Sequence, residues 1–135
     1  MADKKIPSEL AEQLQRIGES FTQMLLRLME EQSITVKEFY HKAHIDRRHF
    51  YKIQHTDDYR PQKRTVLLCA IALKLDMKTT QDLLGTAGYA FSNSSVSDII
   101  VQYCIRKGKY DLFYINELLY YYNQELLGTK DECVI

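Results

Sequence analysis

The sequence contains few residues that interrupt helices, with five glycines and two prolines among 135 residues. A fold of many short strands needs turn residues at regular intervals, so this scarcity argues against an all-β protein. Hydrophobic residues make up 45% of the chain and charged residues 27%, which excludes disorder as the default state. The length fits one domain of roughly 100–200 residues. We therefore expect helices joined by short connections around one core.

Cysteines and long apolar runs are also scarce. Cys69, Cys104 and Cys133 form an odd number without CxxC spacing, which argues against a disulfide scaffold or a zinc ribbon. Reduced thiols are typical of the cytoplasm. Residues 1–13 lack the apolar stretch of a signal peptide, and no run approaches the ~18 apolar residues of a membrane span. We expect a cytoplasmic protein that has no membrane partner.

The sequence lacks the local signatures of catalysis. It has no nucleophile elbow, no P-loop, no glycine-rich dinucleotide loop and no HExxH motif. His41 and His44 are three residues apart and could ligate a metal, but this pair alone does not define a zinc site. We expect a protein that is not an enzyme and that has no metal and no cofactor.

The charges balance overall but are unevenly distributed. There are 18 Lys and Arg and 18 Asp and Glu, which excludes a non-specific polycation. Residues 35–64 nevertheless carry eight positive and four negative groups, together with all four histidines. Such a basic stripe is what a directional contact with nucleic acid needs. The alternative is a solvated helix face on which basic residues gather by chance.

The first half of the chain has the apolar periodicity of helices. One stripe runs through residues 10–32, and Gly18 is a point at which it could break into two helices. Thr35 and Glu38 match a capping box that opens a short helix over 36–43. The members of the stripe are Leu10, Leu14, Ile17, Phe21, Met24, Leu25 and Leu28.

Five further helices are predicted after residue 45. Asp46 is a suitable N-cap for a helix over 47–54, and the apolar segment 63–75 predicts a central buried helix. Later caps predict three more: Thr79 or Thr80 opens a helix to Ala87, Ser94 or Ser95 opens one over 96–107, and Asp111 opens one over 112–126. No strand is expected, so the predicted fold class is all-α.

Residues 35–54, TVKEFYHKAHIDRRHFYKIQ, resemble the lambda-repressor-like (Xre-type) helix-turn-helix family. Residues 61–75, PQKRTVLLCAIALKL, resemble the helix that follows in that family, and the resemblance extends over about residues 18–90. The positions that match the family's core are Phe39, Ala43, Ile45, Phe50 and Ile53, and Asp46 matches its cap. The resemblance implies a repressor-like helical bundle, here extended by two C-terminal helices.

Three residues depart from the family pattern. His44 replaces the usual turn glycine, although histidine tolerates a positive φ better than a β-branched residue does. Tyr40 replaces a small alanine, so the two helices must pack differently there or Tyr40 must point outward. Val36 stands where a glutamine often reaches a phosphate, which removes one expected DNA contact.

The second half of the chain resembles a poorly defined module that occurs in bacteria and phages. The resemblance lies in LLGTAGYAFS at 83–92, DIIVQYCI at 98–105 and YDLFYINELL at 110–119. It implies a bacterial source and says little about chemistry. The expected organisation is an N-terminal helical arm or partly disordered segment (1–15), a helix-turn-helix domain (16–90), a C-terminal helical extension (91–128) and a flexible tail (129–135).

The helix-turn-helix resemblance implies a transcriptional regulator that binds double-stranded DNA, with the helix over 47–54 in the major groove. The expected base contacts are Arg47, Arg48, His49 and Lys52. The expected phosphate contacts are Thr35, Lys37, Arg60, Lys63 and Arg64. Asp57 and Asp58 in the following loop oppose such a contact electrostatically.

A single copy with five or six phosphate contacts would bind weakly, so we expect a homodimer. The surface offered for a dimer or another protein partner consists of Tyr110, Tyr114, Tyr120, Tyr121 and Tyr122. The alternative function is a helical protein-interaction module of a bacterial operon or defence system that keeps the fold but does not bind DNA. Pairing of Arg47 or Arg48 with Asp57 or Asp58 would favour this alternative.

Overall fold

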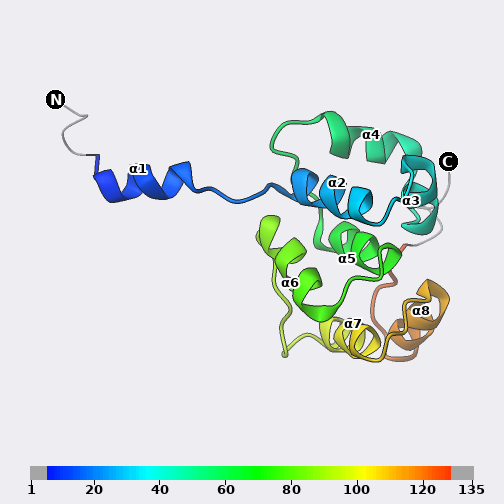
Figure 1. Ribbon diagram of the computed structural model, residues 1–135. Coiled ribbons are helices and arrows are strands. Elements are labelled where there is room, and N and C mark those ends of the chain that lie inside the picture. Colours follow the sequence, from blue (N-terminus) through cyan, green and yellow to red (C-terminus); the bar gives the residue numbers. More distant parts are fainter. Residues whose placement is uncertain (1–5, 129–135) are drawn as a thin grey trace.

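The computed structural model describes residues 6–128 (Figure 1). Within this range it contains eight α-helices and no strand, which confirms the all-α fold class. The predicted tail at 129–135 and the first five residues of the predicted arm lie outside the described residues. The helices are α1 (Ser8–Gln15), α2 (Phe21–Glu31), α3 (Val36–Lys42), α4 (Arg47–His55), α5 (Lys63–Ala72), α6 (Met77–Thr86), α7 (Val96–Arg106) and α8 (Leu112–Tyr121).

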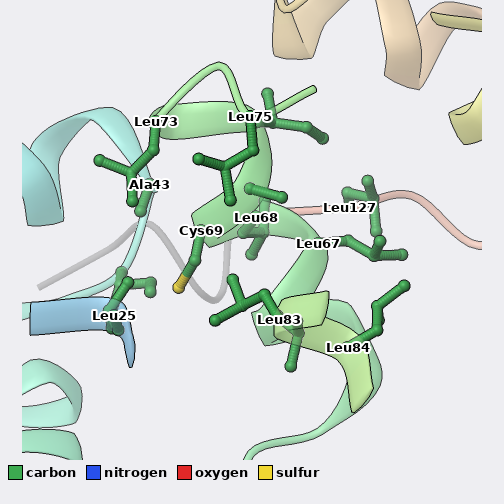
Figure 2. Close-up of a cluster of buried hydrophobic side chains, with 14 of the residues drawn as sticks. Leu25, Ala43, Leu67, Leu68, Cys69, Leu73, Leu75, Leu83, Leu84 and Leu127 are labelled. Carbon is green, nitrogen blue, oxygen red and sulfur yellow. The ribbon is translucent and has the colours of Figure 1, made fainter. Parts of the chain in front are cut away.

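Helix α5 forms the centre of the core, as its uniformly apolar sequence predicts. Every residue from Thr65 to Ile71 is buried. Figure 2 shows Leu67, Leu68 and Cys69 of α5 among the buried leucines of α2 and α6. In Figure 1, α4 lies on one side of α5, whereas α7 and α8 lie on the opposite side. The core around α5 therefore separates α4 from the α7–α8 pair.

The α3–α4 unit is fixed by caps at both helix starts. The Thr35 hydroxyl accepts from the Glu38 amide at 3.1 Å, and the Glu38 carboxylate accepts from the Thr35 amide at 2.9 Å. The Asp46 carboxylate accepts from the His49 amide at 2.7 Å and so starts α4. These bonds satisfy amides that have no partner within the helix, and the predicted caps and boundaries of both helices are confirmed to within a residue.

The connection between α3 and α4 turns sharply at His44, whose φ is +56°. The Ile45 amide donates to the Tyr40 carbonyl at 3.0 Å, which closes the end of α3. Phe39 and Phe50 are buried with their ring centroids 5.6 Å apart, so an aromatic contact holds the two helices together. Tyr40 is partly buried and packs against the core, which shows how the helices accommodate a large residue there.

The predicted apolar stripe over residues 10–32 is wrong in its first half. The break near Gly18 is present, but Leu10, Leu14 and Ile17 are 45%, 60% and 78% exposed, and α1 buries no side chain. Figure 1 shows α1 projecting from the body at the end of an extended connection. The cause is local: Ser20 and Gln23 form a capping box that starts α2 afresh at Phe21.

Three other predicted helix ends are wrong. Helix α5 ends at Ala72 and not at residue 75, because Lys74 adopts a φ of +53°. Helix α6 begins at Met77, because the Asp76 carboxylate accepts from the Thr79 amide at 2.8 Å and caps the helix before Thr79 or Thr80 can. Helix α8 ends at Tyr121 and does not continue to residue 126. There Asn123 adopts a φ of +61°, and the Gln124 amide donates back to the Leu119 carbonyl at 2.8 Å.

The segment after α8 returns to the core. The Asn116 side chain donates to the Leu127 carbonyl at 2.6 Å and accepts from the Leu127 amide at 2.8 Å. This one side chain therefore satisfies both backbone polar groups of Leu127. Gly128 has a φ of +56°, and a Cβ there would lie 3.0–3.1 Å from Leu112 and Leu68. The positive φ and the close approach both favour glycine, and the contact joins the C-terminal helices to α5.

Candidate nucleic-acid interface

The first turn of α4 presents two arginines on the outer surface of the molecule. Arg47 and Arg48 are exposed directly after the Asp46 cap. Within residues 6–128 neither has an ion-pair partner, so Asp57 and Asp58, which are also exposed, do not neutralise them. The positive end of the helix dipole adds to these two charges.

Arg47 and Arg48 line an open cleft of about 680 Å³ between the end of α3 and the start of α4. The other side chains with a polar group in the lining are Tyr40, His41, His44 and Asp46. Asp46 is already engaged by the His49 amide. The cleft therefore joins two guanidinium groups, two imidazoles and a phenol around a single carboxylate, which is a lining suited to an anionic ligand.

His49 does not lie on this cleft. Its ring is hydrogen-bonded to the Tyr59 hydroxyl, with Nε2 and the oxygen 2.7 Å apart, and the two rings meet edge to face. Tyr59 packs against the core, and burial raises the pKa of its hydroxyl. His49 thus holds the loop after α4 in place. His49 therefore does not join Arg47 and Arg48 at the cleft, although all three were expected to contact bases.

The outer face of α4 also contains an aromatic residue that sequence reasoning missed. Tyr51 is 63% exposed and its ring lies 4.2 Å from that of His55. Arg47, Tyr51 and His55 recur at intervals of four residues, so they share one face of α4. That spacing was visible in the sequence. Lys52 is likewise exposed and follows Arg48 by four residues.

The five residues expected at phosphates are placed differently from one another. Lys37 and Arg60 are exposed, and Thr35 is exposed with its hydroxyl already bound as a cap. Arg64 is partly buried. Lys63 is bound to Asp98, with its Nζ 2.6 Å from a carboxylate oxygen, and this pair ties α5 to α7. Because Lys63 is paired with Asp98, it is not available to bind a phosphate beside α4.

Of the five tyrosines expected at a partner surface, four line two adjoining grooves at α8, because Tyr114 lies with Tyr122 in one and with Tyr120 and Tyr121 in the other. The Tyr110 hydroxyl donates to the Leu75 carbonyl at 2.7 Å, so this side chain is part of the fold. Tyr114 is partly buried. The remaining three lie at the end of α8 and are exposed to 76%, 75% and 53% for Tyr120, Tyr121 and Tyr122.

In residues 6–128, no group of three His, Cys, Asp or Glu side chains is arranged to hold a metal ion. The helices of this range are all too short or too polar to cross a membrane. Cys69 and Cys104 are free and buried, and burial raises the pKa of both thiols. No protein-family model, no curated protein and no solved structure matches the chain.

Proposed function

We propose that the chain is a cytoplasmic, sequence-specific DNA-binding regulator of transcription that places the first turn of α4 in the major groove. The observation that carries this proposal is the pair Arg47 and Arg48, which are exposed, lack counter-ions among the described residues and line a cationic cleft. An arginine at the start of a recognition helix can bond guanine O6 and N7 together, which discriminates by about 1–3 kcal/mol.

The neighbouring groups divide into two roles. Lys52, and Tyr51 beside it, lie on the exposed face of α4 and are proposed to face the groove. Lys37 and Arg60 are proposed to bind phosphates and to fix the register without reading sequence. His49 is left out of the base contacts because its ring is bound to Tyr59. Two copies of α4, in a dimer, provide the affinity that one short helix lacks.

Fluorescence anisotropy with a random-sequence duplex at about 50 and 200 mM salt tests the electrostatic part. A protein with about four phosphate contacts loses roughly a hundredfold in affinity over this range. We expect Arg47→Ala/Arg48→Ala to abolish most of the binding. The matched control is Lys74→Ala/Lys78→Ala, which removes two exposed cations near the start of α6, outside both α4 and the α7–α8 helices, and should leave binding intact. Absence of binding by the folded wild type at low salt would refute the proposal.

A charge-conserving variant tests the reading of bases. Lysine keeps the positive charge but cannot form the two parallel bonds that guanidinium makes with guanine. After selection of a preferred site from random DNA, Arg47→Lys/Arg48→Lys should lose about tenfold or more in affinity for that site. Its affinity for random DNA should stay near that of the wild type. Equal losses on both duplexes would restrict these arginines to phosphate binding.

A further inference from the structure

Two apolar surfaces of this chain are exposed and complementary. The first centres on Leu10 and Leu14, which are one turn apart and so share one face of α1, with exposed Ile6 just before the helix and exposed Ile17 just after it. An isolated helix of eight residues is marginal in water. Helix α1 has neither a buried side chain nor a side-chain N-cap, so its stability calls for a partner surface.

The second surface is an apolar groove of about 430 Å³ between α7 and α8. Its lining comes from aliphatic and tyrosine side chains alone, and its floor belongs to the core. A groove of this kind receives the apolar face of an amphipathic helix. The lining includes Val96, Ile99 and Tyr103 from α7, Tyr114 and Leu118 from α8, and Tyr122 directly after it.

The charges beside the two surfaces are opposite. Helix α1 carries Glu9 and Glu12, and Arg16 follows it directly, so residues 8–16 have a net charge of −1. The C-terminal end of α7 carries Arg106, and Lys107 and Lys109 follow it. Lys107 lies 5.9 Å from the centre of the Tyr103 ring, at the edge of the groove. An acidic helix in the groove would thus lie beside three cations.

We propose that α1 of one copy of the chain binds in the α7–α8 groove of a second copy, so that two copies exchange arms. Figure 1 shows α1 projecting away from the body that carries its own groove. One eight-residue helix covers less than the roughly 1,200–2,000 Å² of a standard interface, so the contact is made twice by a two-fold exchange. The groove lies across α5 from α4, which leaves α4 uncovered in the dimer.

Sedimentation velocity across a wide range of protein concentration tests the exchange. We expect a dimer for the wild type, and a dissociation constant raised about tenfold or more by the arm variant Leu10→Asp/Leu14→Asp or the groove variant Ile99→Asp. All three positions are exposed, so both variants should keep the wild-type circular dichroism. The controls Ser8→Asp/Gln15→Asp, on the face of α1 opposite to Leu10 and Leu14, and Phe113→Asp, outside the groove, should still dimerise.

A mixing experiment separates arm exchange from other dimers. The arm variant keeps an intact groove and the groove variant keeps an intact arm, so an equimolar mixture should form heterodimers although neither dimerises alone. A wild type that stays monomeric, or a dimer that survives both variants, would overturn the inference. The inference refines the dimer of the proposed function, but it is measured without DNA. Failure to bind DNA and failure to exchange arms are therefore distinguishable.

Discussion

At the scale of single residues, Asp98 shows how the C-terminal helices are held on the core. Its carboxylate is buried and accepts from the Lys63 ammonium at 2.6 Å and from the Ser92 amide at 2.9 Å. Its own amide donates to the Ser95 hydroxyl that caps α7. One side chain thus connects the first residue of α5, the loop before α7 and α7 itself. A buried charge is tolerated there because it is paired and hydrogen-bonded.

Replacement of this carboxylate should destabilise the fold. Asp98→Asn leaves the Lys63 ammonium partly buried without a counter-ion, and we expect a loss of about 2–4 kcal/mol in the free energy of unfolding, measured in urea. The control is Asp82→Asn, which breaks the exposed Lys78–Asp82 pair and should cost less than about 0.5 kcal/mol. Equal effects of the two substitutions would show that burial of the Lys63–Asp98 pair contributes nothing.

A second residue-scale prediction concerns acid. The hydrogen bond from the Thr79 amide lowers the pKa of the Asp76 carboxyl below its usual value. Stability from this ionised cap is fully present above the unfolded pKa, about 3.9, and is lost as the pH falls through the lower folded value. Asp76→Asn keeps an oxygen for the cap but removes the charge. Urea unfolding at pH 5 and below should show a smaller acid-induced loss in this variant than in the wild type.

At the scale of helices, four C-termini end in the same way without glycine. After α2, α3, α5 and α8, the residues Ser33, His44, Lys74 and Asn123 adopt φ values of +54°, +56°, +53° and +61°. In each case the next amide donates back to a carbonyl in the last turn. A residue with a Cβ is strained in this left-handed conformation, by roughly 1–2 kcal/mol. These ends are therefore sites where glycine would be the better residue.

Lys74 offers the cleanest test because it is exposed and its side chain has no partner among the described residues. Lys74→Gly should raise the free energy of unfolding by about 0.5–1 kcal/mol, after allowance for the extra freedom of glycine in the unfolded chain. The control Gln81→Gly, in the exposed interior of α6, should lower it by about 0.5–1 kcal/mol. If Lys74→Gly does not raise the free energy of unfolding, the left-handed turn at Lys74 is not strained.

These ends also explain how far sequence reasoning reached. The caps at Thr35, Asp46 and Ser95 act within four residues, so the starts of α3, α4 and α7 were predictable. The start of α6 was not, because Asp76 and Thr79 both fit a cap and only the hydrogen bond distinguishes them. The apolar character of Leu10 and Leu14 was evident, but periodicity cannot say whether a stripe faces its own core or another molecule.

The candidate site shows the same difference between local features, which the sequence predicts, and contacts between distant residues, which it does not. Exposure of Arg47 and Arg48 follows from their position directly after a cap and off the face that buries Phe50 and Ile53, so sequence was sufficient. The engagement of His49 by Tyr59 depends on the path of a loop ten residues away. The pairing of Lys63 with Asp98 joins residues 35 positions apart. Neither contact leaves a local signal in the sequence.

At the scale of the whole molecule, α4 lies on one side of α5, and α7 and α8, which line the apolar groove, lie on the other (Figure 1). A dimer held by exchanged α1 arms therefore leaves both copies of α4 accessible. Two recognition helices bound to one duplex must lie about 34–36 Å apart, one helical turn of DNA. The extended connection before α2 gives the arm a reach that a contact between rigid surfaces lacks.

This arrangement makes the salt dependence of DNA binding a measure of dimerisation. The slope of log affinity against log salt is proportional to the number of phosphates contacted, so two copies of α4 give twice the slope of one. The arm variant Leu10→Asp/Leu14→Asp, titrated with a duplex long enough for two half-sites, should show about half the wild-type slope. Because Ser8→Asp/Gln15→Asp adds the same charge to the opposite face of α1, it should keep the full slope. If the arm variant also kept the full slope, dimerisation through α1 would play no part in DNA binding, even if the arms exchange in solution.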